Sequence, residues 1–196
     1  ALLRLIQKWL KAGVLEQDGQ VIHPAAGTPQ GGVISPILAN ITLHHVLDLW
    51  FQKVVKKRCR GEACLIRYAD DFVTAFERRE DAERFHQELI ERLEKFGLEL
   101  STAKTRVIAF HREPPSGGSR FEFLGFEFSW GKDRQGRPHL KRLTARKRLS
   151  ASLVRLAQWC RAVRHLELRE LFRVLNAKLR GYYNYYGVVG NYASLA

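Results

Sequence analysis

Two adjacent acids, Asp70 and Asp71, are the residues of this 196-residue sequence whose type and spacing most directly suggest chemistry. They lie between two short apolar runs rich in β-formers, residues 64–67 and 72–76. This pattern predicts a β-hairpin with both acids at its tip. Mg²⁺ binds a few hard oxygen ligands and leaves its other positions to water and substrate phosphates, so a rigid carboxylate pair suits phosphoryl chemistry. Asp is also common in turns, and the stretch could be a turn without chemistry.

The elements expected first in the chain are a helix and a short hairpin. Apolar residues recur with helical spacing over residues 2–11, and Gly13 is placed to end that helix. Residues 14–22 then have the pattern of two short strands joined by a tight turn at Asp18 and Gly19.

A glycine-rich loop over residues 27–32 comes next and leads into a long helix. Ser35 is suited to be its N-cap and Pro36 to be its first helical residue, and the predicted helix runs over about residues 36–55. Glycines let a backbone approach a ligand closely, and Gln30 is suited to hydrogen-bond a base or sugar. An ordinary connecting loop is the alternative interpretation.

A helix and further strands are predicted after the acids. Residues 79–96 have an amphipathic helical pattern and Gly97 is the expected C-cap. A strand is predicted over 107–110, so the order hairpin, helix, strand indicates a split βαβ, ferredoxin-like core. Residues 121–128 are predicted to form one strand with a bend at Gly125.

The C-terminal part of the chain is strongly basic. The formal net charge is +13, and residues 132–180 hold 15 Lys/Arg against 3 Asp/Glu, whereas the remainder holds 18 against 17. Helices are predicted over 144–164 and 167–180, followed by four tyrosines within residues 182–186. Clustered cations beside aromatic rings favour a nucleic-acid partner. A solvated basic face and tyrosines that only pack helices are the alternatives.

Composition excludes several classes of protein. Cys59, Cys64 and Cys160 are an odd number without metal-site spacing, which argues against a disulfide framework or zinc ribbon and indicates a reducing, bacterial-type cytoplasm. No apolar run approaches the about 18 residues of a membrane span, and no membrane partner is expected. The sequence contains no Met and begins inside a helical pattern, so we expect it to be part of a longer chain.

Four motifs occur in one order along the chain. They are Gly27-Thr28-Pro29-Gln30-Gly31-Gly32 with Ser35-Pro36-Ile37-Leu38-Ala39-Asn40, then Tyr68-Ala69-Asp70-Asp71, then residues 97–105 including Lys104, then Phe123-Leu124-Gly125-Phe126. Their order and spacing resemble the reverse transcriptase palm from motif B through motifs C and D to motif E. Residues 179–187 further resemble the maturase-specific thumb or X domain of group II intron-encoded proteins.

The resemblance implies a role for each motif. Asp70 and Asp71 match the catalytic, metal-binding acids, and the family reaction is in-line attack of a primer 3′-hydroxyl on a nucleotide α-phosphate held by two Mg²⁺ ions. The residues implied to bind nucleotide and template are Gln30, Gly31, Tyr68 and Lys104. Those implied to form the primer grip are Phe123, Leu124, Gly125 and Phe126. Those implied to bind RNA are Arg146, Lys147, Arg148, Arg155, Lys178 and Arg180.

The implied fold is α+β, a palm with an antiparallel sheet and helices on one face, followed by a helical thumb. We expect a partial palm over residues 1–143 and the start of the thumb or X domain over 144–196. The family's fingers and the motif A aspartate would precede residue 1, so the two-metal site is expected to be incomplete and the 196 residues inactive by themselves.

The implied function is that of an RNA-directed DNA polymerase of a group II intron mobile element, with a maturase role in splicing. Its implied partners are intron RNA, an RNA template with a DNA primer, and deoxynucleotides. Two alternatives remain open: an RNA-binding maturase module without polymerase activity, and a non-intron bacterial reverse transcriptase such as a retron or diversity-generating enzyme.

Overall fold

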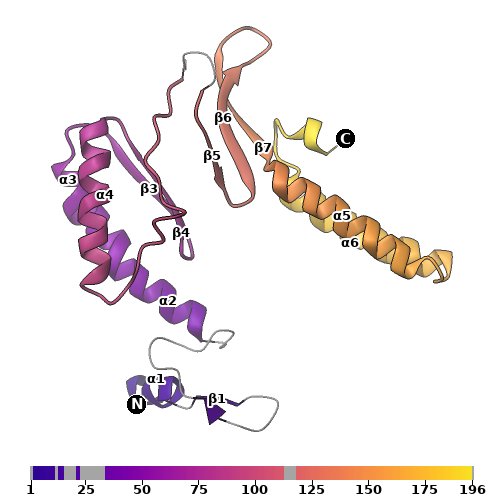
Figure 1. Cartoon of the computed structure of the whole chain (residues 1–196), viewed down its shortest axis with the longest axis horizontal. Helices are drawn as coiled ribbons and strands as arrows, with labels where there is room; N and C mark the ends of the chain where they lie inside the picture. The colour runs from indigo at the N-terminus through magenta and orange to yellow at the C-terminus, as the bar shows by residue number, and fades with distance from the viewer. Residues whose placement is uncertain (1, 12, 16–20, 23–33, 113–117, 196) are drawn as a thin grey trace. The chain divides into compact units, whose positions relative to one another are not determined.

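The computed structural model describes the chain except residues 1, 12, 16–20, 23–33, 113–117 and 196 (Figure 1). The chain divides into two compact units, Ala1–Thr105 and Arg106–Ala196. Both contain helices and antiparallel β-pairs, which confirms the predicted α+β class.

The first unit begins with the predicted helix and hairpin. Helix α1 spans Leu2–Lys11, and strand β1 (Val14–Leu15) pairs antiparallel with β2 (Val21–Ile22). Gly13, just past α1, has a φ of +76°, a left-handed conformation that ends a helix and favours glycine. The predicted turn at Asp18 and Gly19 and the glycine-rich loop lie outside the described residues.

The long helix after that loop is confirmed as one helical run from Ser35 to Arg58. It consists of α2 (Ser35–Leu43), the π-helical segments η1 (His44–Asp48) and η2 (Phe51–Val55), and α3 (Lys56–Arg58). The predicted N-cap was wrong by one residue. The carbonyl of Ile34 accepts hydrogen bonds from the N–H groups of both Ile37 and Leu38, so Ile34 is the N-cap and Ser35 the first helical residue.

The core of the first unit lies between this helical run, a hairpin and a second helix. Strands β3 (Ala63–Tyr68) and β4 (Asp71–Phe76) pair antiparallel, and α4 spans Arg79–Glu94. The buried residues at their junction are Val46, Leu47, Trp50, Phe51, Val55, Ala63, Phe85, Leu89 and Leu93. Burial alternates along β3, so the helices cover one face of the hairpin and leave the other exposed.

Gly97 was predicted as the C-cap of α4, but Lys95 is the C-cap, and Gly97 is the left-handed residue that follows the helix end. Gly97 has a φ of +68°, and the Leu98 N–H donates to the Leu93 carbonyl at 3.0 Å, which is the six-residue bond of a Schellman motif.

Two strand predictions were wrong. Residues 107–110 pair with no strand among the described residues, because β-forming side chains give propensity but a strand also needs a ladder partner. Residues 121–128 form a hairpin rather than one bent strand: β5 (Arg120–Phe123) turns at Leu124 and Gly125 into β6 (Phe126–Lys132). Both turn residues have positive φ, 50° and 78°, which is the geometry of a tight two-residue hairpin turn.

The second unit consists of a three-stranded sheet and two helices. Its strand order is β5-β6-β7, and β7 spans Pro138–Thr144. Helices α5 (Arg146–Val163) and α6 (Leu168–Tyr186) follow, and a short 3₁₀ turn spans Tyr192–Ser194.

Helices α5 and α6 pack against one another (Figure 1). The ammonium of Lys178 lies 5.2 Å from the ring centroid of Trp159, a cation–π contact between the two helices. Helix α6 continues six residues beyond the predicted end, so the tyrosines are helical. No helix among the described residues has the length and apolarity needed to cross a bilayer.

Candidate functional site

The two acids lie at the tip of the β3–β4 hairpin, as predicted. The last pair of the ladder is Tyr68 with Asp71, and Ala69 and Asp70 form the two-residue turn. Both acids are exposed. Ala69 has a φ of +54°, which costs a residue with a side chain about 1–2 kcal/mol, so the surrounding structure must hold this turn in place.

The side chain that holds the turn is Arg67. Its Nε and Nη2 donate to the two carboxylate oxygens of Asp48 at 2.8 and 2.7 Å. Its Nη1 donates to the Asn40 side-chain oxygen at 2.8 Å and to the Ala69 carbonyl at 2.7 Å. One guanidinium therefore ties the turn to two positions of the long helix, Asn40 in α2 and Asp48 in η1.

The Arg67–Asp48 pair is charged under ordinary conditions. Hydrogen bonding from the Arg67 guanidinium lowers the pKa of Asp48, although partial burial opposes that effect. The same hydrogen bond raises the pKa of Arg67. The arginine side chain is 12% exposed and that of Asp48 is 25% exposed, so water screens this pair less than a surface ion pair.

The carboxylates of Asp70 and Asp71 form no hydrogen bond or ion pair with another residue of the described part of the chain. Two exposed carboxylates without partners fit Mg²⁺, which is commonly held by one or two carboxylates together with water and substrate phosphates. The described ranges contain no group of three or more His, Cys, Asp or Glu that could hold a metal. Two neighbouring carboxylates have the oxygen donors for only one side of such a centre.

The other residues predicted to contact nucleotide and template lie as follows. Gln30 and Gly31 are outside the described residues. Tyr68 is 67% exposed at the end of β3. Lys104 is exposed in a turn closed by its own N–H, which donates to the Ser101 carbonyl at 3.0 Å. Within the described ranges no hydrogen bond or ion pair joins Lys104 to the acids.

In the second unit, the residues predicted to form the primer grip make up the β5–β6 turn. The hydroxyl of Tyr185 donates to the Leu124 carbonyl at 2.8 Å, and the Phe126 ring stacks on that of Tyr185 with centroids 5.8 Å apart. A Cβ on Gly125 would lie 2.8 Å from the Tyr186 hydroxyl, so glycine is needed here for space as well as for its positive φ. Tyr185 and Tyr186 therefore pack against this turn.

The six predicted RNA-binding residues are all exposed on the two long helices. Arg146, Lys147, Arg148 and Arg155 belong to α5, and Lys178 and Arg180 belong to α6. Helix α5 carries five cations and no acid along its 18 residues. Three of them occupy its first turn, where the helix dipole disfavours positive charge.

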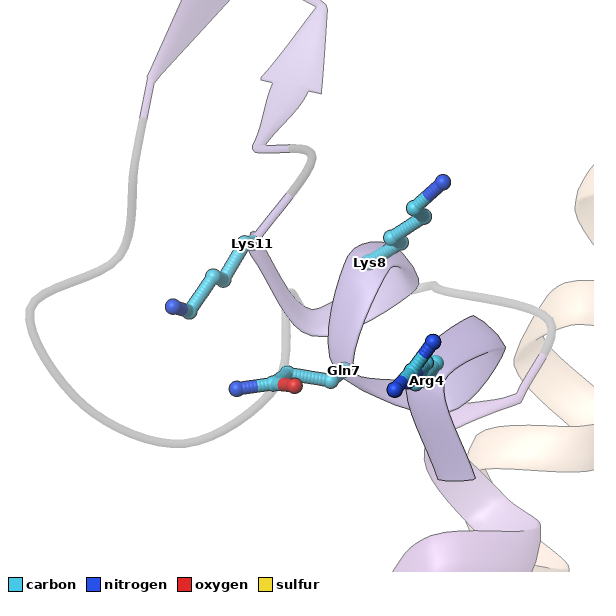
Figure 2. Close-up of a pocket in the computed structure, with 4 residues that line it drawn as sticks. All are labelled: Arg4, Gln7, Lys8 and Lys11. Carbon is cyan, nitrogen blue, oxygen red and sulfur yellow. The ribbon is translucent and has the colours of Figure 1, made fainter. Parts of the chain in front are cut away.

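A pocket beside α1 is lined by Arg4, Gln7, Lys8 and Lys11 (Figure 2). The four residues are spaced to lie on one face of the helix. They include no carboxylate, hydroxyl, thiol or imidazole, so we assign no catalytic role to this pocket.

Sequence reasoning missed Arg67, Asp48 and Asn40. Two of them carried a recognisable signal, because Arg67 is a cation within an apolar strand and Asp48 lies between two leucines of an apolar helix. A charge at such a position needs a partner, and these two charges have opposite signs.

Known proteins resemble this chain along nearly its whole length. It is 25% identical to the group II intron-encoded protein LtrA of Lactococcus lactis subsp. cremoris, over 98% of this chain and 44% of that protein. It is 25% identical to an uncharacterized 91 kDa protein in the cob intron of Schizosaccharomyces pombe, over 96% of this chain and 31% of that protein. It is also 26% identical to the telomerase reverse transcriptase of Takifugu rubripes, over 54% of this chain and 9% of that protein.

The chain spans less than half the length of each of these relatives. The relatives that cover nearly all of it are intron-encoded, which confirms the predicted resemblance to group II intron-encoded proteins. The family model described as reverse transcriptase (RNA-dependent DNA polymerase) matches residues 2–128, well over half of the sequence. The chain belongs to the reverse transcriptase family.

Proposed function

We propose that this chain is part of an RNA-directed DNA polymerase of the group II intron type, with Asp70 and Asp71 as its metal-binding acids. The observation that carries the proposal is the geometry of the tip. Two exposed carboxylates lie on one tight turn, and a fork of hydrogen bonds from Arg67 anchors that turn to the long helix. A member of this family with such a tip has the donors needed to hold Mg²⁺.

In the proposed reaction, this chain's residues bind and orient the nucleic acid and the nucleotide. When bound at the acids, Mg²⁺ supplies Lewis-acid stabilisation of the charge that develops on the attacked phosphate. Exposed Tyr68 lies next to the acids and offers its ring to a nucleotide or template base. Gln30, Gly31 and Lys104 are proposed to complete the nucleotide contacts.

The remaining assignments are also proposals. Residues 1–143 are proposed to be part of a palm with a ferredoxin-like core, and residues 144–196 the start of a thumb. The β5–β6 turn is proposed to grip the primer. The Tyr185 hydroxyl bonds the Leu124 carbonyl, and the Phe126 ring stacks on Tyr185. These contacts support the role, because a turn that holds the primer must keep its shape when the primer binds.

The test is primer extension by the longest natural polypeptide that contains this sequence, with Mg²⁺ and deoxynucleotides. We expect Asp70→Asn to reduce synthesis about 10³-fold or more, because losing a metal ligand removes several kcal/mol of transition-state stabilisation. The matched control is Asp133→Asn, at a half-buried turn aspartate of the second unit. It gives up an ion pair with Arg137, but Asn can still accept the turn's backbone hydrogen bonds. Residues 1–196 by themselves are expected not to extend a primer.

If Asp70→Asn retained synthesis equal to that of Asp133→Asn, Asp70 would not belong to the metal site. If Asp70→Asn instead destroyed RNA affinity, the hairpin would be a structural element of an RNA-binding protein.

A second function, RNA binding without polymerisation, is favoured by one feature. The exposed cations of α5 and α6 form a basic surface that needs no polymerase site. A maturase role would use this surface to hold intron RNA. The two functions separate experimentally, because Asp70→Asn should leave RNA affinity unchanged while neutralising the first turn of α5 should lower it.

A further inference from the structure

We propose that Arg67 is a positioning residue for the metal-binding acids and that Asn40 and Asp48 are its anchors. This inference rests on the proposed function, since it concerns how Asp70 and Asp71 are presented to a metal. It adds three residues to the site that neither contact the reacting groups nor belong to the predicted set.

The turn does not fix its own shape. Ala69 is at φ +54° and both acids are exposed, so neither its backbone preference nor burial holds the tip in this shape. Arg67 Nη1 donates a hydrogen bond to the Ala69 carbonyl at 2.7 Å. That carbonyl belongs to the peptide whose N–H is that of Asp70, so fixing it fixes the backbone from which the Asp70 side chain projects.

The other end of the link is rigid. Asp48 lies next to Leu47, which is 1% exposed in the core. The Asp48 carboxylate accepts two hydrogen bonds from the Arg67 guanidinium. Asn40, two turns earlier in the same helical run, accepts a third hydrogen bond from this guanidinium. A helix anchored in the core therefore sets the position of the turn through one planar group.

The arrangement requires a guanidinium. The four hydrogen bonds of Arg67 come from three nitrogens of one planar group. A lysine ammonium is a point charge and cannot reach Asp48, Asn40 and Ala69 in the same directions.

Neutralisation of the Arg67 charge by Asp48 also favours metal binding at the acids. A cation three positions before Asp70 could pair with the acids and compete with Mg²⁺. Because Asp48 takes Arg67 in a bidentate pair, the arginine's charge is neutralised away from the tip, and the oxygens of Asp70 and Asp71 stay available.

The experiment compares metal binding by the longest natural polypeptide that contains this sequence and by its variants, using Mn²⁺ followed by electron paramagnetic resonance. We expect Arg67→Lys to weaken Mn²⁺ binding about 10- to 100-fold, the range typical of groups that orient metal ligands. The Mg²⁺ concentration for half-maximal primer extension should rise in parallel, with RNA affinity unchanged. The melting temperature should fall as it should for Asp48→Asn, because both changes weaken the Arg67–Asp48 pair.

The matched control is Arg84→Lys. Arg84 also bonds a carboxylate and a backbone carbonyl, those of Asp81 and Arg58, at 2.7 and 2.9 Å, but it does not contact the hairpin tip. Its replacement should leave both metal measurements unchanged.

A second variant guards against a folding defect in Arg67→Lys. Asn40 is exposed on α2, and alanine favours helices, so Asn40→Ala should fold normally while removing one anchor. We expect a smaller shift in the same direction for both metal measurements.

The outcomes are distinguishable. If Asp70→Asn lowers Mn²⁺ affinity while Arg67→Lys and Asn40→Ala both match Arg84→Lys, the positioning role is overturned and the proposed function stands. If Asp70→Asn leaves Mn²⁺ affinity and synthesis intact, the proposed function itself fails.

Discussion

Asp48 is the single residue whose ionisation should report on the anchored tip. Its pKa in the folded chain is lowered, chiefly by the hydrogen bonds from Arg67, so it stabilises the fold above the unfolded-state pKa of about 3.9. That stabilisation is lost as pH falls through the lower, folded-state pKa. The pair should therefore be complete at neutral pH and weaken below about pH 4.

We expect Asp48→Asn to lower the free energy of unfolding by about 1–3 kcal/mol at pH 7, because it leaves a mostly buried arginine with a weaker acceptor. Below about pH 4 the difference from the wild type should shrink, since the wild-type carboxyl then also becomes neutral. Urea denaturation at a series of pH values measures this. A difference that stayed constant from pH 7 to pH 2.5 would show that the ionised pair does not stabilise the fold.

Single residues also show what sequence reasoning can reach. The position of Asp70 and Asp71 at a hairpin tip followed from two β-forming runs around a short polar stretch, which is a local signal. The Arg67 network did not follow, because Asn40 and Asp48 are 27 and 19 positions away from Arg67 in the sequence. A local sequence pattern does not predict which face of a helix will pack against a given strand.

At the scale of elements, the helices were the more predictable part. Apolar stripes, together with the Ser35–Pro36 start signal and Gly97, located the long helix, α4, α5 and α6. The hairpin of residues 121–128 was missed because Leu124 occupies a positive-φ turn position, where Asn or Gly is the usual signal. The turn is held by contacts from distant α6 rather than by its own residue preferences.

The side chain of Asn191 links the end of α6 to the sheet through hydrogen bonds. It is fully buried, and its side-chain oxygen accepts the Thr144 N–H at 2.9 Å. Its amide nitrogen donates to the Thr144 hydroxyl and to the Tyr186 carbonyl, each at 2.8 Å. One side chain thus joins the last residue of β7 to the last residue of α6, whose neighbour Tyr185 bonds the β5–β6 turn.

We expect Asn191→Ala to cost about 2–4 kcal/mol of unfolding free energy, because it leaves buried donors and acceptors without partners. Thermal denaturation measures the loss. The control is Asn184→Ala, on the exposed surface of α6, which should change stability by less than about 0.5 kcal/mol. Equal effects of the two changes would mean that Asn191 does not fasten α6 to the sheet.

At the scale of the whole molecule, charge is divided unevenly along the chain. The basic segment falls within the second compact unit, and the first unit carries the acids. Helix α5 begins with Arg146, Lys147 and Arg148 and has no acid in its first turn. Cations at a helix N-terminus disfavour the helix, so these three residues are better explained by a ligand than by stability.

We therefore expect replacement of Arg146, Lys147 and Arg148 by Gln to weaken RNA binding while leaving the melting temperature unchanged or slightly raised. If each contacts a phosphate, the slope of log affinity against log salt should become shallower by about 2. Filter binding at a series of salt concentrations measures both quantities. Primer extension on saturating template should change much less than RNA affinity, because these residues lie outside the proposed metal site.

The matched control removes the same number of charges from the first unit, by changing Lys56, Lys57 and Arg58 to Gln. These cations lie in the last turn of their helix, where the dipole favours them, so a stabilising role already accounts for their position. We expect this variant to lose a little stability and to keep most of its RNA affinity and salt slope. If the two triple variants weakened RNA binding equally, affinity would follow net charge alone, and α5 would not be the RNA-binding surface.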